Sequence, residues 1–345
     1  MAGEPILDKR SSRRVASLAK EGAKVAQDPN DSAPTFTIFT PTYNRAHVLG
    51  RVYRSLVAQT FRDFEWLVID NASSDGTRAL VEGWVRDAEI TIRYLQNEVN
   101  IGHQGSWRRG IQEARGKLFV ETRSADSFFP HALERLMYHW DSIPDDERSR
   151  FSAVTALAVD EHGQLNGTPF PRDVVDADSI SIRFRHKVKG DKFGFQRLDV
   201  LRSVPIPEIP GYTGEIPARI VWRAIARRYK TRYVNERLRV FWQDQGPGLS
   251  RPLDGWVNAP GRVLDAQDLL NNDLSWLPLA PLTFFRDAAA YVCSGWHAGR
   301  SPARQIVELH GTGARLLWLA ALPVGTAFYL IQRLAPRLGR WLPNP

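Results

Sequence analysis

The stretches PTFTIFTPTYNR (residues 34–45) and VIDNASSDGT (residues 68–77) decide the fold of this chain. Each is an apolar run that ends in a polar turn, at Pro41 in the first stretch and at Asp70 in the second. We expect both runs to be strands. In an open α/β sheet, ligands bind just beyond the carboxyl ends of the parallel strands. Two such ends that carry Asn, Arg and Asp therefore predict a nucleotide site.

Strand and helix patterns alternate around these motifs, from residue 35 to about residue 143, as is typical of βαβ units. The predicted strands are Thr35–Thr40, Glu65–Asp70, Ile90–Leu95 and Leu118–Thr122. The predicted helices are Ala46–Gln59, Gly76–Arg86, Gln104–Ala114 and Pro130–Trp140. From residue 151 to 252 we expect strands at Ser152–Val159, Ile180–Phe184, Gly194–Leu198 and Arg232–Trp242, and a helix at Ala218–Arg228. A polar segment then leads to a helix through Ala290.

Composition narrows the classes of partner and compartment. The chain has 345 residues and a formal charge of +8, which favours nucleic acid, anionic lipid or a nucleotide diphosphate as partner. We do not expect nucleic acid, because the sequence has no zinc-finger, RNP or helix-turn-helix signature. Cys293 is the single cysteine, which excludes an internal disulfide and fits a reducing cytoplasm. Residues 1–33 are polar and basic, and we expect a disordered lead-in without a secretion signal.

The two opening motifs resemble those of the family 2 glycosyltransferases with a GT-A fold, whose first strand ends in a PTYNR-like turn and whose second ends in xxDNxSxDGT. The resemblance covers about residues 34–250. It implies an α/β fold, a Rossmann-like mixed sheet with helices on both faces. It also implies a nucleotide-sugar-binding half at 34–150, an acceptor-binding half at 151–252 and a helical extension at 253–345.

The resemblance implies a donor-binding role for a set of residues near these turns. At the position of Asp70 the family accepts a hydrogen bond from uracil or contacts the nucleoside, and we expect few neighbours to bury this carboxylate. Tyr43 supplies a stacking face and Arg45 a charge for the phosphates. Without the resemblance, either motif is a structural turn with a capping side chain. The predicted donor-binding residues are Pro41, Thr42, Tyr43, Asn44, Arg45, Asp70, Asn100, Gly102, Arg108 and Arg123.

Residues 97–116 resemble the family's NxGxxxNWNRGIxxAxG segment, a loop that enters a helix. Asn100 and Gly102 are expected to shape the loop, and Arg108 or Arg109 to meet the diphosphate. The alternative is a plain amphipathic helix whose arginines are solvated.

The next segment departs from the family, whose carboxylate cluster, LDSDD or HDDD, holds Mn²⁺ or Mg²⁺ at the donor diphosphate. Residues 122–130 keep only Asp126, and Arg123 stands where an Asp is usual. Two alternatives follow. Asp126 holds Mg²⁺ or Mn²⁺ with phosphate oxygens and water completing the shell, or Arg123 supplies part of the cation's charge and catalysis is weak or metal-independent.

Inverting transfer also needs a general base that takes the proton of the acceptor hydroxyl. Residues 207–222 precede and begin a predicted helix, and a helix N-terminus favours the charged form of a nearby carboxylate. Glu215 is the predicted base and Glu208 the reserve. Some relatives place their Glu where Ala218 stands, so that Glu215 has to reach the site from the preceding turn or the base is missing. The alternative is a solvated loop Glu.

Two further stretches bear on the acceptor. Residues 219–244 resemble a block of a bacterial subgroup, predicted as scaffold first and acceptor or lipid-phosphate contact second, with Glu236 paired to an Arg. Residues 316–331 are apolar, shorter than the ~20 residues of a spanning helix, and we expect Pro323 with Gly325 to break them midway. Flanking arginines and aromatics favour a segment lying in a membrane interface over a hairpin packed on the protein's own core.

Together these patterns predict an inverting glycosyltransferase on the inner face of the cell membrane. Its donor is a nucleotide sugar, most simply a UDP-sugar, and its acceptor a polysaccharide or lipid-linked glycan at an anionic bilayer. One rival is a catalytically impaired relative that binds nucleotide or acts as a scaffold there. Another, a nucleotidyltransferase, is disfavoured because residues 41–47 are not a Gly-rich basic loop.

Overall fold

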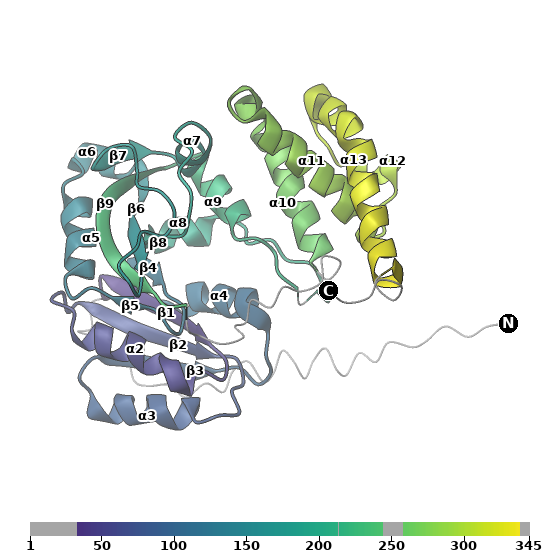
Figure 1. Cartoon of the computed structure of the whole chain (residues 1–345). Helices are drawn as coiled ribbons and strands as arrows, with labels where there is room; N and C mark the ends of the chain where they lie inside the picture. Colours follow the sequence, from purple (N-terminus) through teal and green to yellow (C-terminus); the bar gives the residue numbers. More distant parts are fainter. Residues whose placement is uncertain (1–32, 213, 244–257, 339–345) are drawn as a thin grey trace. The chain divides into compact units, whose positions relative to one another are not determined.

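The computed structural model describes residues 33–212, 214–243 and 258–338. The predicted lead-in therefore lies almost wholly outside the described residues. Within them, the centre is a nine-stranded mixed sheet with the order β3-β2-β1-β4-β8-β6-β9-β5, and β7 also pairs with β9 (Figure 1). The strands are β1 (Phe36–Thr42), β2 (Phe64–Asp70), β3 (Thr91–Gln96), β4 (Leu118–Glu121), β5 (Ser127–Phe128), β6 (Phe151–Asp160), β7 (Val174–Ala177), β8 (Lys192–Arg197) and β9 (Lys230–Phe241).

The first half of the sheet is the predicted βαβ arrangement. Strands β1, β2, β3 and β4 are parallel, and the register places Thr42 opposite Asp70. The chain then reverses, since β8 is antiparallel to both β4 and β6, while β6 and β9 are parallel. The predicted mixed sheet is confirmed.

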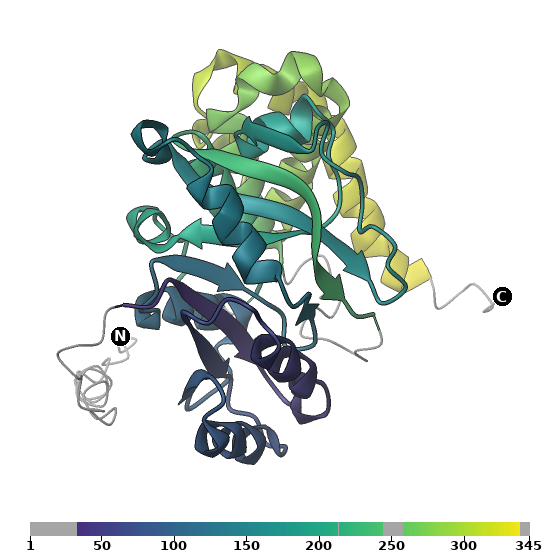
Figure 2. The same cartoon turned by 90° about the vertical axis from the view of Figure 1, so that its left-hand side faces the viewer.

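Helices cover both faces of this sheet (Figures 1 and 2). One face packs against α2 (Ala46–Val57), α3 (Thr77–Asp87) and α5 (Ala132–Asp141) around the buried Trp66 and Phe36. The other packs against α4 (Gly102–Glu113), α8 (Leu198–Ser203) and α9 (Arg219–Ala226) around the buried Trp107 and Phe39. The short helix α6 (Asp145–Arg148) follows α5.

The prediction of a strand at residues 180–184 is wrong. These residues belong to helix α7 (Ser179–Phe184), whose buried side chains are Ile180, Ile182 and Phe184. Alternating burial over so few residues fits a strand or a short helix. The N-cap favours the helix: the Asp178 carboxylate accepts a hydrogen bond from the backbone N–H of Ser181 at 2.7 Å, and the helix begins there.

The C-terminal part of the described chain is helical. It comprises α10 (Ala259–Asn272), the 3₁₀ helix η2 (Leu274–Leu279), α11 (Pro281–His297), α12 (Pro302–Val307) and α13 (Gly311–Leu338). Helix α10 was not predicted and occupies most of the expected polar segment. Its Leu269 and Leu270 pack with α11 and α13 around the buried Phe284 and Trp318.

The expected break at Pro323 and Gly325 is also wrong, since α13 runs through both residues. Gly325 is instead a packing contact: a Cβ built on it would lie 2.5 Å from the carbonyl oxygen of Ala289 on α11. Among the described residues, Gly311–Leu334 is one helix that is long and apolar enough to cross a membrane by length and composition.

Candidate active site

The turns after β1 and β2 lie together at one edge of the sheet, as predicted. Asn44 adopts a positive φ of 52°, and its side-chain oxygen accepts hydrogen bonds from the backbone N–H of Ser74 at 2.8 Å and Asp75 at 3.3 Å. Its own backbone N–H donates to the Ser73 hydroxyl at 2.8 Å. Asn44 thus ties the first turn to the second and fixes the edge at which a nucleoside is expected.

The expectation that Asp70 has few neighbours is wrong. Its carboxylate is fully buried and accepts bonds from the backbone N–H and hydroxyl of Ser73, at 2.9 and 2.6 Å, and from the Tyr94 hydroxyl at 2.5 Å. Burial and this bond to Asp70 raise the pKa of Tyr94. A carboxylate has about four acceptor positions, so roughly one stays available to a ligand. Ser73 also fills the space between Asp70 and Asn44.

The other residues of the first turn differ in how accessible they are. Tyr43 is partly exposed. Arg45 is only 7% exposed, and its backbone N–H donates to the Thr77 hydroxyl at 3.3 Å. The Thr42 hydroxyl is buried and has no hydrogen-bond partner among the described residues. Of these three side chains, Tyr43 is the most accessible to solvent.

The loop before α4 has the predicted shape. The Asn100 side chain accepts a hydrogen bond from the backbone N–H of Gly102 at 2.9 Å, and Gly102 takes a φ of 73° that favours glycine. Behind it, the buried Asn71 accepts bonds from Asn97 at 2.7 Å and Ser106 at 2.8 Å. These bonds hold the α4 N-terminus against the edge formed by the β1 and β2 turns.

Two arginines of α4 are already occupied. Arg109 donates to the backbone oxygen of Gln96 at 3.1 Å and to the side chain of Asn97 at 2.5 Å. Arg108 forms an ion pair with Glu208 at 2.9 Å, so the predicted phosphate ligand and the predicted reserve base neutralise each other. The pair joins α4 to the segment before α9, and the Glu208 side chain is 67% exposed.

Asp126 lies between two guanidinium groups. Its Oδ2 is 3.3 Å from Arg123 Nε and 3.6 Å from Arg239 Nη1, while its Oδ1 is buried without a partner among the described residues. Arg123 also stacks on Phe241, with its guanidinium carbon 3.8 Å from the ring centroid. Burial raises the pKa of Asp126, against the lowering effect of Arg239 and Arg123.

This donor set does not fit a divalent cation held by protein carboxylates. Asp126 is fully buried and faces two positive charges, and the part of the chain that the structure describes contains no group of three or more His, Cys, Asp or Glu able to hold a metal ion. Mg²⁺ and Mn²⁺ take several oxygen ligands, so phosphate and water would have to supply nearly all of them.

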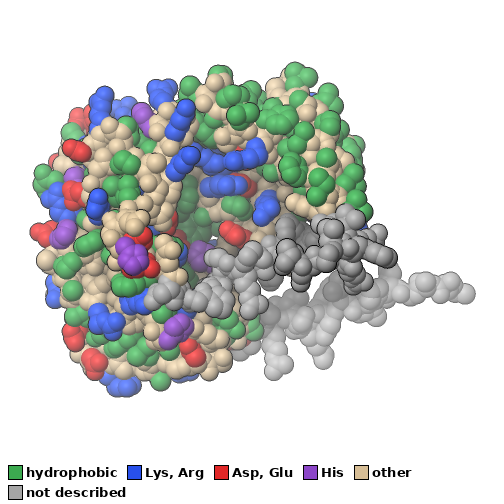
Figure 3. All heavy atoms as spheres, viewed as in Figure 1, with side chains coloured by type: hydrophobic (Ala, Val, Ile, Leu, Met, Phe, Trp, Pro, Cys, Tyr) green, Lys and Arg blue, Asp and Glu red, His purple; other side chains and the backbone are tan. Residues whose placement is uncertain are grey.

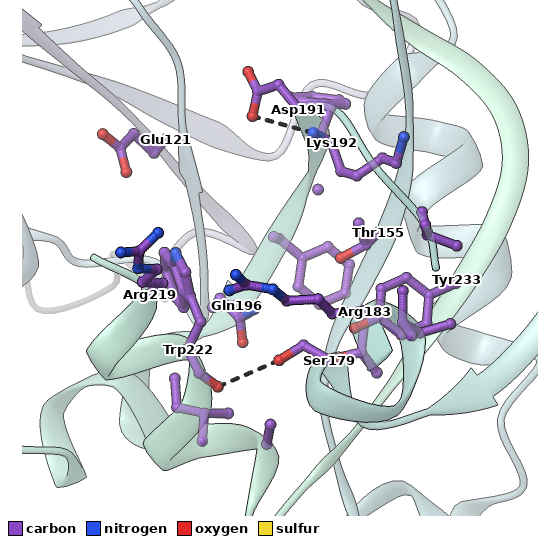
Figure 4. Close-up of a pocket in the computed structure, with 18 of the residues that line it drawn as sticks. Glu121, Thr155, Ser179, Arg183, Asp191, Lys192, Gln196, Arg219, Trp222 and Tyr233 are labelled. Atoms are coloured by element: carbon purple, nitrogen blue, oxygen red, sulfur yellow. Dashed lines mark hydrogen bonds between the residues drawn. The ribbon is translucent and has the colours of Figure 1, made fainter. Parts of the chain in front are cut away.

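A cavity of about 580 Å³ opens beside Asp126, between β4, β8, α7 and α9 (Figure 4). At its β4 wall, Glu121 Oε1 lies 2.9 Å from His103 Nε2. Enclosure in the cavity lowers the pKa of His103, but the hydrogen bond to Glu121 and the charges of Glu121 and Glu215 outweigh it and raise the pKa. Glu215 itself is exposed on the turn before α9, within electrostatic reach of His103 and Arg219. The predicted base therefore lies near the cavity rather than against the donor turns.

Sequence reasoning missed three residues of this cavity. Glu121 follows an apolar run and was not singled out, and Asp191, whose carboxylate pairs with Arg239 at 2.5 Å, lies in an unremarkable loop. Arg183 was placed on a strand instead of α7. Only Glu121 carried a signal, because a carboxylate at the end of a buried strand lies where α/β folds bind ligands.

Comparison with known proteins finds a family resemblance in the first half of the chain. Residues 37–147 match the family model described as glycosyl transferase family 2. Over these residues, about a third of the chain, the protein resembles glycosyl transferase family 2. The matched residues run from β1 to α6 and include both opening turns, the α4 loop and Asp126.

Two curated relatives of this chain come from bacteria. The "GalNAc(5)-diNAcBac-PP-undecaprenol beta-1,3-glucosyltransferase" of Campylobacter jejuni is 29% identical over 104 residues, which are 30% of this chain and 34% of that protein. The "UDP-Glc:alpha-D-GlcNAc-diphosphoundecaprenol beta-1,3-glucosyltransferase WfgD" of Escherichia coli is 31% identical over 98 residues, 28% of this chain and 38% of that protein. The chain thus spans about a third of the length of the curated relatives it matches.

A solved structure supports the fold over a longer range. The crystal structure of S. aureus TarS 1-349 in complex with UDP-GlcNAc superposes with a TM-score of 0.58 at 17% identity, covering 88% of this chain and 92% of that one. At this identity the likeness shows the shared GT-A fold.

Proposed function

We propose that the protein transfers a sugar from a UDP-sugar to a lipid-linked glycan, with inversion at the anomeric carbon. The observation that carries this proposal is the link through the start of α4: Asn71, after β2, donates to the Gly102 backbone oxygen at 3.3 Å, and the next residue, His103, lines the cavity that holds carboxylates and arginines. The family's fold supports the transfer. The Campylobacter jejuni and Escherichia coli relatives are named as glucosyltransferases with an undecaprenol diphosphate acceptor, which supports the acceptor class.

In the proposed reaction, the acceptor hydroxyl oxygen forms a bond to the anomeric carbon of the donor. The bond between that carbon and the diphosphate oxygen breaks, and its electron pair leaves with UDP. Glu215 takes the hydroxyl proton, directly or through a water, because its carboxylate is exposed and lies near the cavity. Glu208 is the weaker choice, since Arg108 already pairs with it.

The leaving diphosphate needs positive charge beside it. In the proposed site Arg123 supplies that charge, since it is 41% exposed, lines the cavity and stands where the family usually carries an acid. Arg239 holds Asp126 from the other side. A bound Mg²⁺ or Mn²⁺ would add charge at the same diphosphate, with phosphate oxygens as its main ligands.

Donor turnover tests the proposal. Purified protein is incubated with a panel of UDP-, GDP- and TDP-sugars and an undecaprenyl diphosphate glycan, in EDTA and in Mn²⁺, and UDP release is measured. We expect turnover of one or more UDP-sugars that persists in EDTA at a tenth or more of the Mn²⁺ rate. Absence of turnover together with absence of UDP binding by calorimetry would discard the function.

The second candidate function is a catalytically impaired relative, and the pairing of Asp126 with arginines favours it. Matched variants distinguish an active enzyme from such a relative. Glu215→Gln should lower kcat by about 10²–10⁴-fold, the usual contribution of a general base, with an unchanged melting temperature. Glu208→Gln, a neighbouring exposed carboxylate, should lower it less than about threefold. Equal, small effects of both variants would remove Glu215 from the mechanism.

A second proposal concerns location. We place the protein at the cytoplasmic face of the membrane, bound through the exposed side of α13. In Figure 3, hydrophobic side chains gather over the region of α11 and α13. Leu316, Leu319, Phe328 and Ile331 on α13 are 54–62% exposed. A lipid-linked acceptor would then be presented at the surface that carries the cavity.

A further inference from the structure

The cavity is strongly basic. Six Lys or Arg residues line it against two acids, Glu121 and Asp191. The basic residues are Arg123, Arg183, Lys192, Arg219, Arg223 and Arg239. Figure 3 shows Lys and Arg side chains gathered beside a hollow on the face viewed. Whether this charge can hold a ligand depends on which of the six side chains already have partners.

Most of them are occupied. The Lys192 ammonium donates to three backbone carbonyls, those of Asn166, Thr168 and Lys189, at 2.8–3.3 Å. Arg223 bonds to two aspartates of α10 at 2.7 and 3.0 Å. Arg123 and Arg239 are held by Asp126 and Asp191, as described above. Lys192, Arg223 and Arg239 thus position the walls of the cavity, and Arg123 is the group that the proposed reaction places at the donor diphosphate.

Arg183 is different. Its guanidinium makes no hydrogen bond and no ion pair with any residue that the structure describes, and its guanidinium carbon lies 5.3 Å from the ring centroid of the adjacent Phe184. Figure 4 shows it extending from α7 into the cavity toward Trp222 and Arg219. Burial and the positive charges of Arg219 and Arg223 lower the pKa of Arg183. A partly buried guanidinium without an acid is costly unless an anion joins it.

Arg219 completes a pair of cations. It holds Asp265 through Nε and Nη2, and no described residue bonds to its Nη1, while its side chain is 48% exposed. The Ser179 hydroxyl donates to the backbone oxygen of Trp222 at 3.5 Å, which links α7 to α9 and fixes the two arginines relative to each other. Asp287 on α11 acts on both guanidiniums electrostatically but forms no ion pair with either within the described chain.

We propose that Arg183 and Arg219 bind a phosphate group of the acceptor, on the α7–α9 side of the cavity. Two guanidinium forks match the charge and the several oxygens of a phosphate ester. Trp222 and Phe184 line the same wall and offer apolar surface to the sugar or isoprenoid attached to it. Of the described residues that line the cavity, none comes from the turns after β1 and β2, so this site is separate from the nucleoside edge. The inference rests on the proposed function and names its acceptor class.

Calorimetry with inorganic pyrophosphate tests the site in buffer without divalent ions, with and without saturating UDP. We expect wild-type protein to bind pyrophosphate even when UDP is saturating. Arg183→Gln should weaken that binding about tenfold or more and leave UDP affinity within twofold. Arg185→Gln is the matched control, because Arg185 is an exposed arginine of the same turn that does not line the cavity. It should change neither affinity.

A second variant gives an effect of opposite sign. Asp287→Asn removes the acid that competes for the two guanidiniums, so pyrophosphate should bind severalfold more tightly. The inference is overturned if UDP abolishes pyrophosphate binding, if Arg183→Gln weakens UDP as much as pyrophosphate, or if pyrophosphate does not bind. These results differ from failure of the proposed function, which is absence of UDP binding and of sugar transfer in the wild-type protein.

Discussion

Glu236 joins β9 to α5 through three hydrogen bonds. Its carboxylate accepts two from Arg135, at 2.8 and 2.6 Å, and its Oε1 lies 2.5 Å from His139 Nε2. The bonds from Arg135, with a smaller contribution from His139, lower the pKa of Glu236 to about 2, although partial burial acts in the opposite direction. The pairing of Glu236 with an arginine, predicted from the sequence, is confirmed.

Glu236→Gln is expected to destabilise the protein by about 1–2 kcal/mol at pH 7, allowing for solvent screening of a partly exposed pair. Because the folded pKa is depressed, the ionised carboxylate stabilises the fold above about pH 4.5 and loses this effect as pH falls toward 2. Urea unfolding of variant and wild type should therefore differ at pH 7 and converge between pH 5 and 2. A gap of constant size would show that packing, and not charge, is responsible. Glu82→Gln, which breaks an exposed pair with Arg78, should stay within about 0.5 kcal/mol of wild type.

Single residues also show which features of the site the sequence does not predict, namely the partners of its charged side chains. The turns at Asn44 and Asn100 were predictable because both lie in family-like motifs. The Asn100 side chain bonds to the backbone two residues later, and the Asn44 side chain bonds to the backbone of the second motif, thirty residues later. The partner of Arg108 lies 100 residues away, and Arg183 has none among the described residues. The state of a charged side chain depends on such distant contacts, so the motifs predicted the edge of the site but not which arginines are available to phosphate.

At the scale of elements, the pieces missed were mostly short or non-local, with the 14-residue helix α10 as the exception. The first four strands and helices were predicted within a few residues of their observed bounds, because long apolar periods end at strong turn signals. Strands β5 and β7 are two and four residues long and exist only because β9 pairs with them. Helix α7 depends on one cap, at Asp178. None of these has enough sequence to show a period.

Gly325 tests the packing of α13 on α11. In an open helix Gly→Ala stabilises by about 1 kcal/mol, but here the added Cβ would lie 2.5 Å from both the Ala289 oxygen and the Val292 Cβ. We expect Gly325→Ala to destabilise by about 1–3 kcal/mol and to lower the melting temperature by several degrees. Scanning calorimetry measures this, with Ala327→Leu at an exposed position of the same helix as a near-neutral control. A higher melting temperature for Gly325→Ala would show that the two helices do not pack this closely.

At the scale of the whole molecule, charge and the apolar side of α13 act together. The formal charge of +8 attracts anionic lipid, and each Lys or Arg close to such a surface contributes about 1 kcal/mol. Trp318 and Ala321 of α13 are buried against α11 and α10, so crossing a membrane alone would expose this packed side of the helix. That cost favours a helix lying in the interface over one that spans.

We therefore expect the protein to sediment with vesicles of phosphatidylglycerol and much less with vesicles of phosphatidylcholine, and binding to weaken as salt is raised. The double variant Leu319→Glu and Phe328→Glu should reduce binding at least tenfold, because each apolar side chain contributes about 1.5–3 kcal/mol on burial. Val99→Glu changes an equally exposed apolar residue, 65% accessible, in the loop before α4 and should have no such effect. If the double variant leaves vesicle binding unaltered, α13 does not contact the lipid. If the wild type does not bind vesicles at all, the apolar side of α13 is instead expected to bind a protein partner.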